Sequence, residues 1–368
     1  MSRVVVIILH AEPGPGSGPL ELAFAEARRQ NAVRQARGFA ELGATVDIVA
    51  TSAIGPGFGR RLRALAEVHD LARVRTGSGL IVLGSGSIPL AGRLDRARLV
   101  SVAADTSAGT DRPAMLVNNH FSADVLAVRA GTDLGGLPDL AADNAVPRWA
   151  AEHGITVHDL QARWRLQVDL DSPLDVEITS GATRGSPSGA ETTTRVIAAV
   201  LPRLRRVTTD RRAELLVAGR TSSATIRWVE QHTASRTRAL IEERGMKTAE
   251  PRQRPARSTL GLLLDRDGPE ALAMLVETLA DAAVIDTRVL IAHRFGRDEL
   301  AWPTAEDRFA SDLLLPDRVT DPWLRALTAS AATATIPIML GGHTLVGPGL
   351  RLALRSRTTN RESRGARS

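Results

Sequence analysis

The amino-acid sequence predicts an α/β protein of two domains, the first of them built on a mostly parallel sheet. Short apolar runs of strand length alternate with longer segments of helical spacing. The length of 368 residues is enough for two buried cores. Residues 181–194 form a small, polar, Gly- and Pro-rich stretch that is typical of a linker. We therefore expect domains over residues 1–180 and 195–354, and a basic disordered tail over residues 355–368.

The first half begins with a continuous aliphatic run at residues 4–9, which is typical of a strand buried on both faces of a parallel sheet. A Pro- and Gly-rich loop at residues 13–19 leads into a helix that ends before Gly43, a residue suited to the position after a helix. The same patterns predict further strands at residues 46–50, 80–83, 114–117 and 164–170, and helices at residues 21–42, 60–69 and about 139–153.

The second half repeats this alternation of strands and helices. Thr304 precedes Glu306 and Asp307, which indicates a helix with Thr304 as its N-cap. The predicted strands lie at residues 214–218, 260–264, 282–292 and 336–340, and the predicted helices start at about residue 224 and cover residues 269–279 and 305–315.

Composition excludes several classes of site. The chain has no cysteine, so it has no disulfide and no zinc–thiolate centre, and it has no tyrosine. Its one lysine, Lys247, does not lie in a G-x-x-x-x-G-K-[ST] motif. Phosphate recognition would therefore depend on arginine and on backbone N–H groups.

The charge distribution argues against nucleic acid as a partner. The formal net charge is +6, and residues 355–368 alone carry five arginines against one glutamate. The rest of the chain mixes both signs, and an aromatic content of 3% leaves few side chains on which bases stack. No apolar stretch is long enough for a membrane helix, and the N-terminal run is too short for a signal peptide. We expect a cytoplasmic protein.

Three segments of the first half carry a resemblance to a known family. They are LIVLGSGSIPL at residues 80–90, NNHFSADVL at residues 118–126, and QVDLDSPLD at residues 167–175. Together they resemble the nucleotidyltransferases that include the molybdenum-cofactor guanylyltransferases and the 2-phospholactate guanylyltransferases. In that family one strand ends in G-D-x-P-L, and a later segment of the type D-x-D-[ST]-P-x-D closes the domain. The resemblance covers about residues 1–180.

This resemblance implies a GT-A-like Rossmannoid fold and the transfer of a nucleotidyl group from a nucleoside triphosphate to a small-molecule acceptor with Mg²⁺. Asp169 and Asp171 match the late acidic motif, so they become the expected catalytic residues and metal ligands. The remaining nucleotide-binding candidates are glycines and polar residues that follow strands or precede a helix: Gly16, Gly18, Ser85, Ser87, Asn118 and Asn119.

The sequence departs from the family in two places. Ser87 stands where the early metal-binding aspartate should be, and the opening glycine-rich loop with its basic residue is replaced by residues 13–19. One alternative is therefore a catalytically degenerate domain that acts as a small-molecule sensor or scaffold. Another places the activity entirely in residues 195–354. Asp169 and Asp171 also fit ordinary turn and cap positions before a helix.

The second half offers two groups of candidate residues. Arg220, Ser222 and Ser223 lie between a strand and a helix N-terminus, where α/β sheets bind anions; a well-capped helix explains them equally. Asp286 and Arg288 lie inside the apolar run 282–292, so both must be paired or belong to a site. That site would add the second-domain candidates His293 and His343, together with Asp307 and Arg308; a structural ion pair is the alternative. The nucleotide, the acceptor and the oligomeric state stay open.

Overall fold

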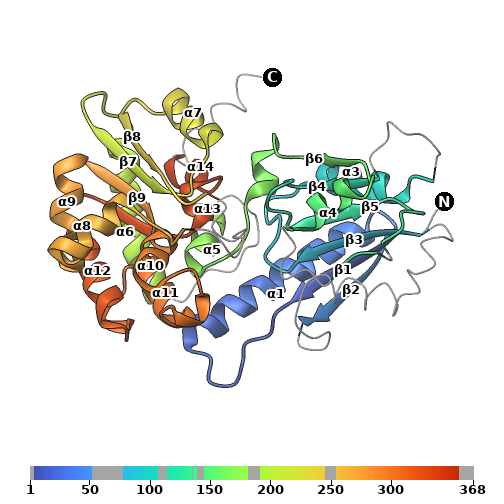
Figure 1. Cartoon of the computed structure of the whole chain (residues 1–368), viewed down its shortest axis with the longest axis horizontal. Helices are drawn as coiled ribbons and strands as arrows, with labels where there is room; N and C mark the ends of the chain where they lie inside the picture. Colours follow the sequence, from blue (N-terminus) through green and yellow to red (C-terminus); the bar gives the residue numbers. More distant parts are fainter. Residues whose placement is uncertain are drawn as a thin grey trace. The chain divides into compact units, whose positions relative to one another are not determined.

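A computed structural model describes residues 4–51, 78–106, 114–134, 136–138, 145–180, 191–244 and 254–355. The chain divides into two compact units, and each contains its own sheet (Figure 1). Unit 1 comprises Met1–Pro15 and Ala25–Leu170, and unit 2 comprises Gly16–Phe24 and Asp171–Ser368. The expected α/β class with two α/β parts is confirmed. The predicted helix at residues 60–69, residues 181–190 of the linker predicted over 181–194, and residues 356–368 of the predicted tail lie outside the described residues. Residues 191–194 of the predicted linker instead begin the helix α6 (Glu191–Val207).

Unit 1 has a mixed sheet of six strands in the order β2-β1-β3-β5-β4-β6. The strands are β1 (Val4–His10), β2 (Thr45–Ala50), β3 (Gly79–Gly84), β4 (Met115–Val117), β5 (Val125–Val128) and β6 (Val157–Asp159). The pairs β1–β2, β1–β3 and β4–β6 are parallel, whereas β5 is antiparallel to both β3 and β4. The predicted mostly parallel sheet is thus a mixed sheet with one reversed strand.

Both faces of β1 are buried, as its continuous apolar run predicted. Val5, Ile7 and Leu9 pack in the core that includes Trp149 of α4 (Val146–Glu152). Their neighbours in the strand pack in the opposite core, which includes Phe39 of α1 (Pro19–Ala40) and Leu99 of α3 (Arg93–Ala104). Unit 1 is therefore a three-layer arrangement of helix, sheet and helix.

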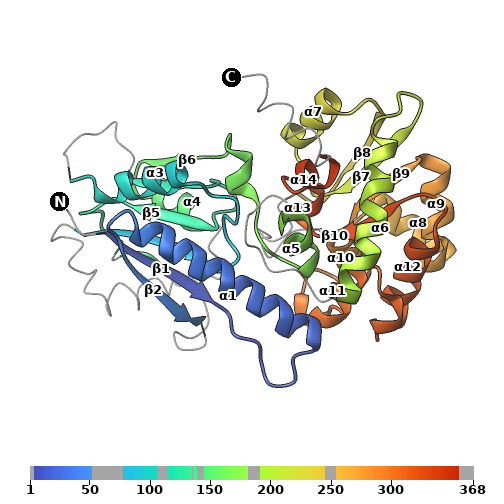
Figure 2. The same ribbon diagram turned by 180° about the vertical axis from the view of Figure 1, so that it is seen from behind.

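Unit 2 has a fully parallel sheet of four strands in the order β10-β9-β7-β8. The strands are β7 (Glu214–Gly219), β8 (Arg236–Ile241), β9 (Ala282–Asp286) and β10 (Ile338–Gly341). In both views the strands lie between α8 and α9 on one side and α13 and α14 on the other (Figures 1 and 2). The helices are α5 (Pro173–Ser180), α6 (Glu191–Val207), α7 (Ser223–His232), α8 (Thr259–Asp267), α9 (Leu272–Leu279), α10 (Thr287–Phe295), α11 (Ala305–Asp312), α12 (Pro322–Thr333), α13 (His343–Val346) and α14 (Leu350–Leu354), with 3₁₀ turns at Pro269–Ala271, Glu299–Ala301 and Pro316–Arg318.

Three predicted strands are wrong. Residues 164–170 contain a 3₁₀ turn, η4 (Trp164–Gln167), followed by an isolated bridge from Asp169 to Ser87. Residues 260–264 belong to α8, whose N-cap Ser258 accepts a hydrogen bond from the Gly261 N–H at 3.2 Å. A short apolar run does not by itself distinguish a buried strand from a buried helix.

The third wrong strand, residues 282–292, is in fact two elements. β9 ends at Asp286, and α10 starts at Thr287. Asp286 is the N-cap of α10, because its side chain accepts a hydrogen bond from the Arg288 N–H at 3.2 Å. Asp286 and Arg288 therefore do not share one face of a strand. The N-cap expected at Thr304 is confirmed, since its side chain accepts from the Asp307 N–H at 3.1 Å.

In each sheet, consecutive strands of the chain are added first on one side of a particular strand and then on its other side. In unit 1 the chain passes from β1 to β2 on one side and then returns to β3 on the other side of β1. In unit 2 it passes from β7 to β8 and then returns to β9 on the other side of β7. Ligands of open α/β sheets bind outside the carboxyl ends of the strands at such a switch point. No helix within the described ranges is long and apolar enough to cross a membrane.

A substitution at Gly79 tests the packing of α3 on unit 1. A Cβ atom at this position would overlap the backbone of Ala103 in α3, and backbone does not yield as a flexible side chain does. We expect Gly79→Ala to lower the free energy of unfolding by about 1–3 kcal/mol, measured by urea denaturation. Gly14→Ala is the control, because a Cβ there has no atom within 4 Å. Equal stability of the two variants would contradict this packing.

Candidate functional site

The switch point of unit 1 is formed by polar side chains at the ends of β1 and β3. His10 is the last residue of β1, and its Nδ1 lies 3.1 Å from the Oγ of Ser85, which directly follows β3. Both residues are buried. Burial lowers the pKa of His10 below its usual value, and the nearby Arg28 guanidinium acts in the same direction. His10 is therefore neutral at physiological pH.

Side chains of α1 hold the loop that follows β3. Asn31 donates its Nδ2 to the carbonyl oxygens of Ser85 and Ser87 at 2.8 and 3.1 Å. Gln35 donates to the carbonyl oxygen of Ile88 at 2.8 Å. Ile88 has a φ of 45°, which is a strained conformation for a β-branched residue. Strained backbone of this kind persists where surrounding contacts hold it, and it is frequent at binding sites.

Gly86 brings this loop against two charged groups. A Cβ atom at Gly86 would lie 2.7 Å from the Leu170 carbonyl oxygen, 2.9 Å from Asp169 Oδ1 and 3.1 Å from Arg28 Nε. The Leu170 N–H donates to the Gly86 carbonyl at 3.1 Å and to Asp169 Oδ1 at 2.9 Å. The structure thus brings Ser85, Ser87 and Asp169 together, and it adds His10 and Arg28.

Asn118 and Asn119 have structural partners. The Oδ1 of Asn118 accepts from the N–H groups of Asp124 and Val125, and its Nδ2 donates to Asp124 and to the Leu166 carbonyl at 3.0 Å each. Asn119 Oδ1 accepts from the Phe121 N–H at 3.0 Å, which closes a turn. These contacts agree with the turn-forming alternative for both residues.

Gly16 and Gly18 belong to unit 2, where a carboxylate occupies the start of α1. Glu306 accepts the N–H of Leu20 at 2.9 Å and that of Glu21 at 3.1 Å. A Cβ atom at Gly18 would overlap the Glu306 carboxyl group. Glu21 in turn accepts the Glu306 N–H at 2.9 Å, so each helix start is bonded to a side chain of the other helix. The N–H donors proposed for phosphate are therefore already bonded.

Asp171 lies in unit 2, since the division between the units falls after Leu170. Its expected pairing with Asp169 on one strand face rested on a strand over residues 164–170 that does not exist. Asp171 is exposed and precedes α5, and its N–H donates to Asp175 Oδ2 at 3.0 Å.

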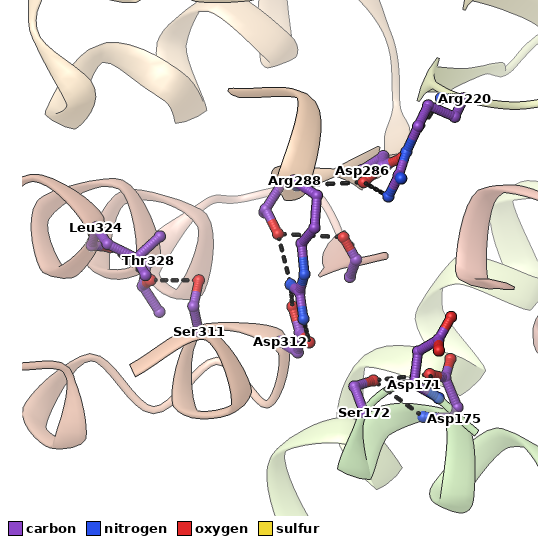
Figure 3. Close-up of polar contacts among 12 residues, drawn as sticks. Asp171, Ser172, Asp175, Arg220, Asp286, Arg288, Ser311, Asp312, Leu324 and Thr328 are labelled. Carbon is purple, nitrogen blue, oxygen red and sulfur yellow. Dashed lines mark hydrogen bonds and ion pairs between the residues drawn. The ribbon is translucent and has the colours of Figure 1, made fainter. Parts of the chain in front are cut away.

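The switch point of unit 2 is occupied by a buried ion pair (Figure 3). Arg220, the first residue after β7, donates Nε and Nη2 to Asp286 at 2.6 and 3.1 Å. The side chains are 11% and 0% exposed. Burial alone would raise the pKa of Asp286, but the Arg220 guanidinium more than offsets this effect and lowers it.

A second arginine–aspartate pair lies beside the first. Arg288 donates both Nη groups to Asp312 at the end of α11, with an Nη2–Oδ2 distance of 2.7 Å. Arg288 also donates to Thr287 Oγ1 at 2.9 Å. Burial by itself would lower the pKa of the Arg288 guanidinium, and the Asp312 carboxylate reverses that effect and raises it. Asp286 and Arg288 therefore each belong to a separate buried ion pair, Asp286 with Arg220 and Arg288 with Asp312.

His343 and Asp175 complete this cluster. Burial lowers the pKa of His343, and the Arg220 guanidinium adds to this effect, whereas Asp286 and Asp171 oppose it. Asp175 is 1% exposed, and its Oδ2 accepts from the Asp171 N–H at 3.0 Å and the Ser172 hydroxyl at 2.9 Å. Burial raises the pKa of Asp175 well above its usual value, and the Asp171 carboxylate raises it further.

The other second-domain candidates have local partners. Ser222 is the N-cap of α7 and accepts the Thr225 N–H at 3.1 Å, whereas Ser223 is the exposed first residue of that helix. His293 makes its hydrogen bonds with residues outside the cluster. Its Nδ1 accepts the Ser258 N–H at 3.1 Å, and its Nε2 lies 2.9 Å from Asp265. Asp307 accepts from Thr320, and Arg308 lies 5.5 Å from the ring centre of Trp302.

Sequence reasoning missed His10, Arg28, Asp175 and Asp312. His10 has a weak signal, because it is the polar residue that ends a buried strand. Asp175 has a clearer one, since Ser172-x-x-Asp175 places an acid at the third position of a helix that starts with Pro173. Asp312 lies in α11 with no distinguishing pattern, and only the fold pairs it with Arg288.

Among the described residues, no group of three or more histidine, aspartate or glutamate side chains could hold a metal ion. A scan of protein-family models found no match to this chain, and no curated protein is similar to it in sequence.

The buried carboxyl group of Asp175 gives unit 2 a pH dependence. Because its pKa is raised above the ordinary value of 3.8, the native state binds this proton more tightly than the unfolded chain does. The stability that it contributes is present at low pH and is lost as the pH rises through the folded pKa. We expect Asp175→Asn, which stays neutral, to gain in melting temperature over wild type as the pH is raised from about 5 to about 9.

The exposed Asp317 provides the matched control, and Asp317→Asn should follow the wild-type melting curve at every pH. A difference between wild type and Asp175→Asn that is independent of pH would show that Asp175 is already ionised in the folded protein.

Proposed function

We propose that unit 1 binds a nucleoside triphosphate at the carboxyl ends of β1 and β3, and that the chain is a nucleotidyltransferase-like protein. The observation that carries this proposal is the strained loop at residues 84–89, which α1 holds at the switch point of the sheet. Residues 80–90 are also the first of the three segments that resemble the nucleotidyltransferase family. The helix–sheet–helix layering of unit 1 is compatible with the GT-A-like fold of that family.

Phosphate binding would depend on Arg28 and on the loop around Gly86. Arg28 Nε approaches the position where a Cβ of Gly86 would lie, and its charge reaches His10. Glycine at position 86 lets the Leu170 carbonyl and the side chains of Asp169 and Arg28 come close to the backbone of the loop. The start of α1 does not take part, because its N–H groups bond Glu306.

Asp169 is a suitable ligand for a magnesium ion that binds together with the nucleotide. In nucleotide sites Mg²⁺ is usually held by one or two carboxylates together with phosphate oxygens and water, and Asp169 supplies one carboxylate beside the loop. When bound, the ion would neutralise negative charge on the triphosphate. His10 is neutral and orients the Ser85 hydroxyl, which leaves both groups able to bond uncharged parts of the nucleotide. A small molecule would be the acceptor.

A second candidate function is nucleotide binding without transfer, as a sensor or scaffold. Ser87, which stands in place of the family's early metal-binding aspartate, favours it, because its isolated bridge to Asp169 brings only one carboxylate to the loop. His10 and Ser85 also bond each other.

Calorimetric titration with each of the four nucleoside triphosphates, with and without Mg²⁺, tests this proposal. We expect binding by wild type that is weakened about 10- to 100-fold in Arg28→Gln, because a charge-assisted contact is lost. Asp169→Asn should weaken binding only when Mg²⁺ is present. Arg37→Gln is the matched control, because Arg37 is exposed on the same helix.

Two results would overturn nucleotide binding at this loop: no heat with any triphosphate, or equal affinities in Arg28→Gln and Arg37→Gln. Release of pyrophosphate with candidate acceptors separates the two functions, since a transferase releases it and a sensor does not.

A further inference from the structure

We propose that unit 2 carries a second ligand site, at the carboxyl ends of β7 and β9, for a small molecule that presents an oxyanion. The group recognised is a phosphate or a carboxylate. This site does not depend on the function proposed for unit 1.

The strand order of the unit 2 sheet determines where this site lies. The chain leaves β7 toward β8 and returns to β9, so the loops after β7 and β9 diverge at their carboxyl ends, where open α/β sheets bind ligands. Arg220 is the first residue after β7, and Asp286 is the last residue of β9. A Cβ atom at Gly219, which has a φ of +123°, would overlap Asp286, so the backbone of β7 lies directly against that side chain.

Both arginines keep hydrogen-bond donors after pairing. Arg220 uses Nε and Nη2 on Asp286, and Arg288 uses its two Nη groups on Asp312 and Thr287. Within the described part of the chain, Arg220 Nη1 and Arg288 Nε make no hydrogen bond. The paired aspartates fix the plane of each guanidinium, which orients the remaining donors.

Two buried side chains have polar atoms without a partner among the described residues. Thr221 follows Arg220, is 0% exposed, and its Oγ1 makes no hydrogen bond. Asp175 Oδ1 makes none either, although its Oδ2 accepts two. A buried polar atom that stays unbonded destabilises the protein, and a ligand that bonds it removes this cost.

The charged groups belong to one cluster, and Thr221 directly follows Arg220 in the chain. The charge of Arg288 interacts with Asp312, Asp286 and Asp175, and that of Arg220 with His343. Burial raises the pKa of Asp175 well above its usual value, which favours the carboxyl O–H form, and its Oδ1 is the oxygen that bonds no described group. Guanidinium N–H, threonine O–H and carboxyl O–H are all donors, so the matching ligand group is an acceptor of several hydrogen bonds.

An oxyanion meets this requirement better than a cation. Asp286 and Asp312 already accept bidentate bonds from arginines, so their oxygens are engaged. The exposed carboxylate of Asp171 opposes an anion, because its charge reaches both His343 and Asp175. Its removal should therefore strengthen binding.

The test is calorimetric titration with inorganic phosphate and, separately, with acetate, at constant ionic strength. It uses the full chain in the Arg28→Gln background, which removes the phosphate contact proposed in unit 1. A failure of the unit 1 proposal then leaves this measurement unaffected. Heat with phosphate alone assigns the site to a phosphate group, and heat with acetate alone assigns it to a carboxylate.

Added substitutions locate the binding. Thr221→Val keeps the shape of the side chain and should weaken binding about tenfold, while Thr209→Val, at an exposed position after α6, should leave it unchanged. Asp175→Asn keeps a donor at the Oδ1 position and should bind as its parent does. Asp171→Asn should bind more tightly.

Arg220→Lys keeps the charge that Asp286 needs but loses the planar fork, and its binding should weaken while cooperative unfolding is retained. The proposal is overturned if neither phosphate nor acetate binds. It is also overturned if Thr221→Val and Thr209→Val have the same affinity.

Discussion

In both units the strand order reverses beside one strand, and the polar groups at that reversal must satisfy each other inside the protein. In unit 1 His10 meets Ser85 across the ends of β1 and β3. In unit 2 Arg220 meets Asp286 across the ends of β7 and β9. A buried charge without its partner is far more costly than a buried hydroxyl, so the second pair is the stricter constraint. It also joins β7 to the start of α10, because Asp286 is the N-cap of that helix.

The sequence predicted the elements whose pattern is long or locally signalled. The aliphatic run at residues 4–9 became β1, and the Thr304 cap marked the start of α11. It failed at residues 282–292, because the apolar residues continue across the change from strand to helix. The only local sign of that change is Asp286, a residue type that suits an N-cap but that the apolar run around it places within a strand. The helix at residues 259–267 was missed for a related reason, since its apolar residues suit a buried strand equally well.

The sequence indicates where several site residues lie in the fold, but it does not indicate which residues they pair with. Ser85 and Arg220 were found because each follows an apolar strand, which is a property of the sequence alone. That Arg288 pairs with Asp312 and not with Asp286 depends on how α10 and α11 pack, and no spacing encodes it. Gly18 was read as a phosphate-binding position, yet the helix start beside it is bonded to Glu306, far along the chain. Such long-range carboxylates have no signature in the segment that they cap.

The exchange between Glu21 and Glu306 has an evolutionary consequence. Each glutamate accepts N–H groups from the first turn of the other's helix, and Arg318 neutralises Glu306 at 2.8 Å. Replacing Glu306 leaves the N–H groups of Leu20 and Glu21 without their acceptor, and replacing Glu21 leaves the N–H of Glu306 without its acceptor. The donors in both cases are backbone groups, which a non-proline substitution at the other position retains. Each glutamate therefore caps one helix start independently, and related chains should keep a side-chain acceptor at each position on its own account.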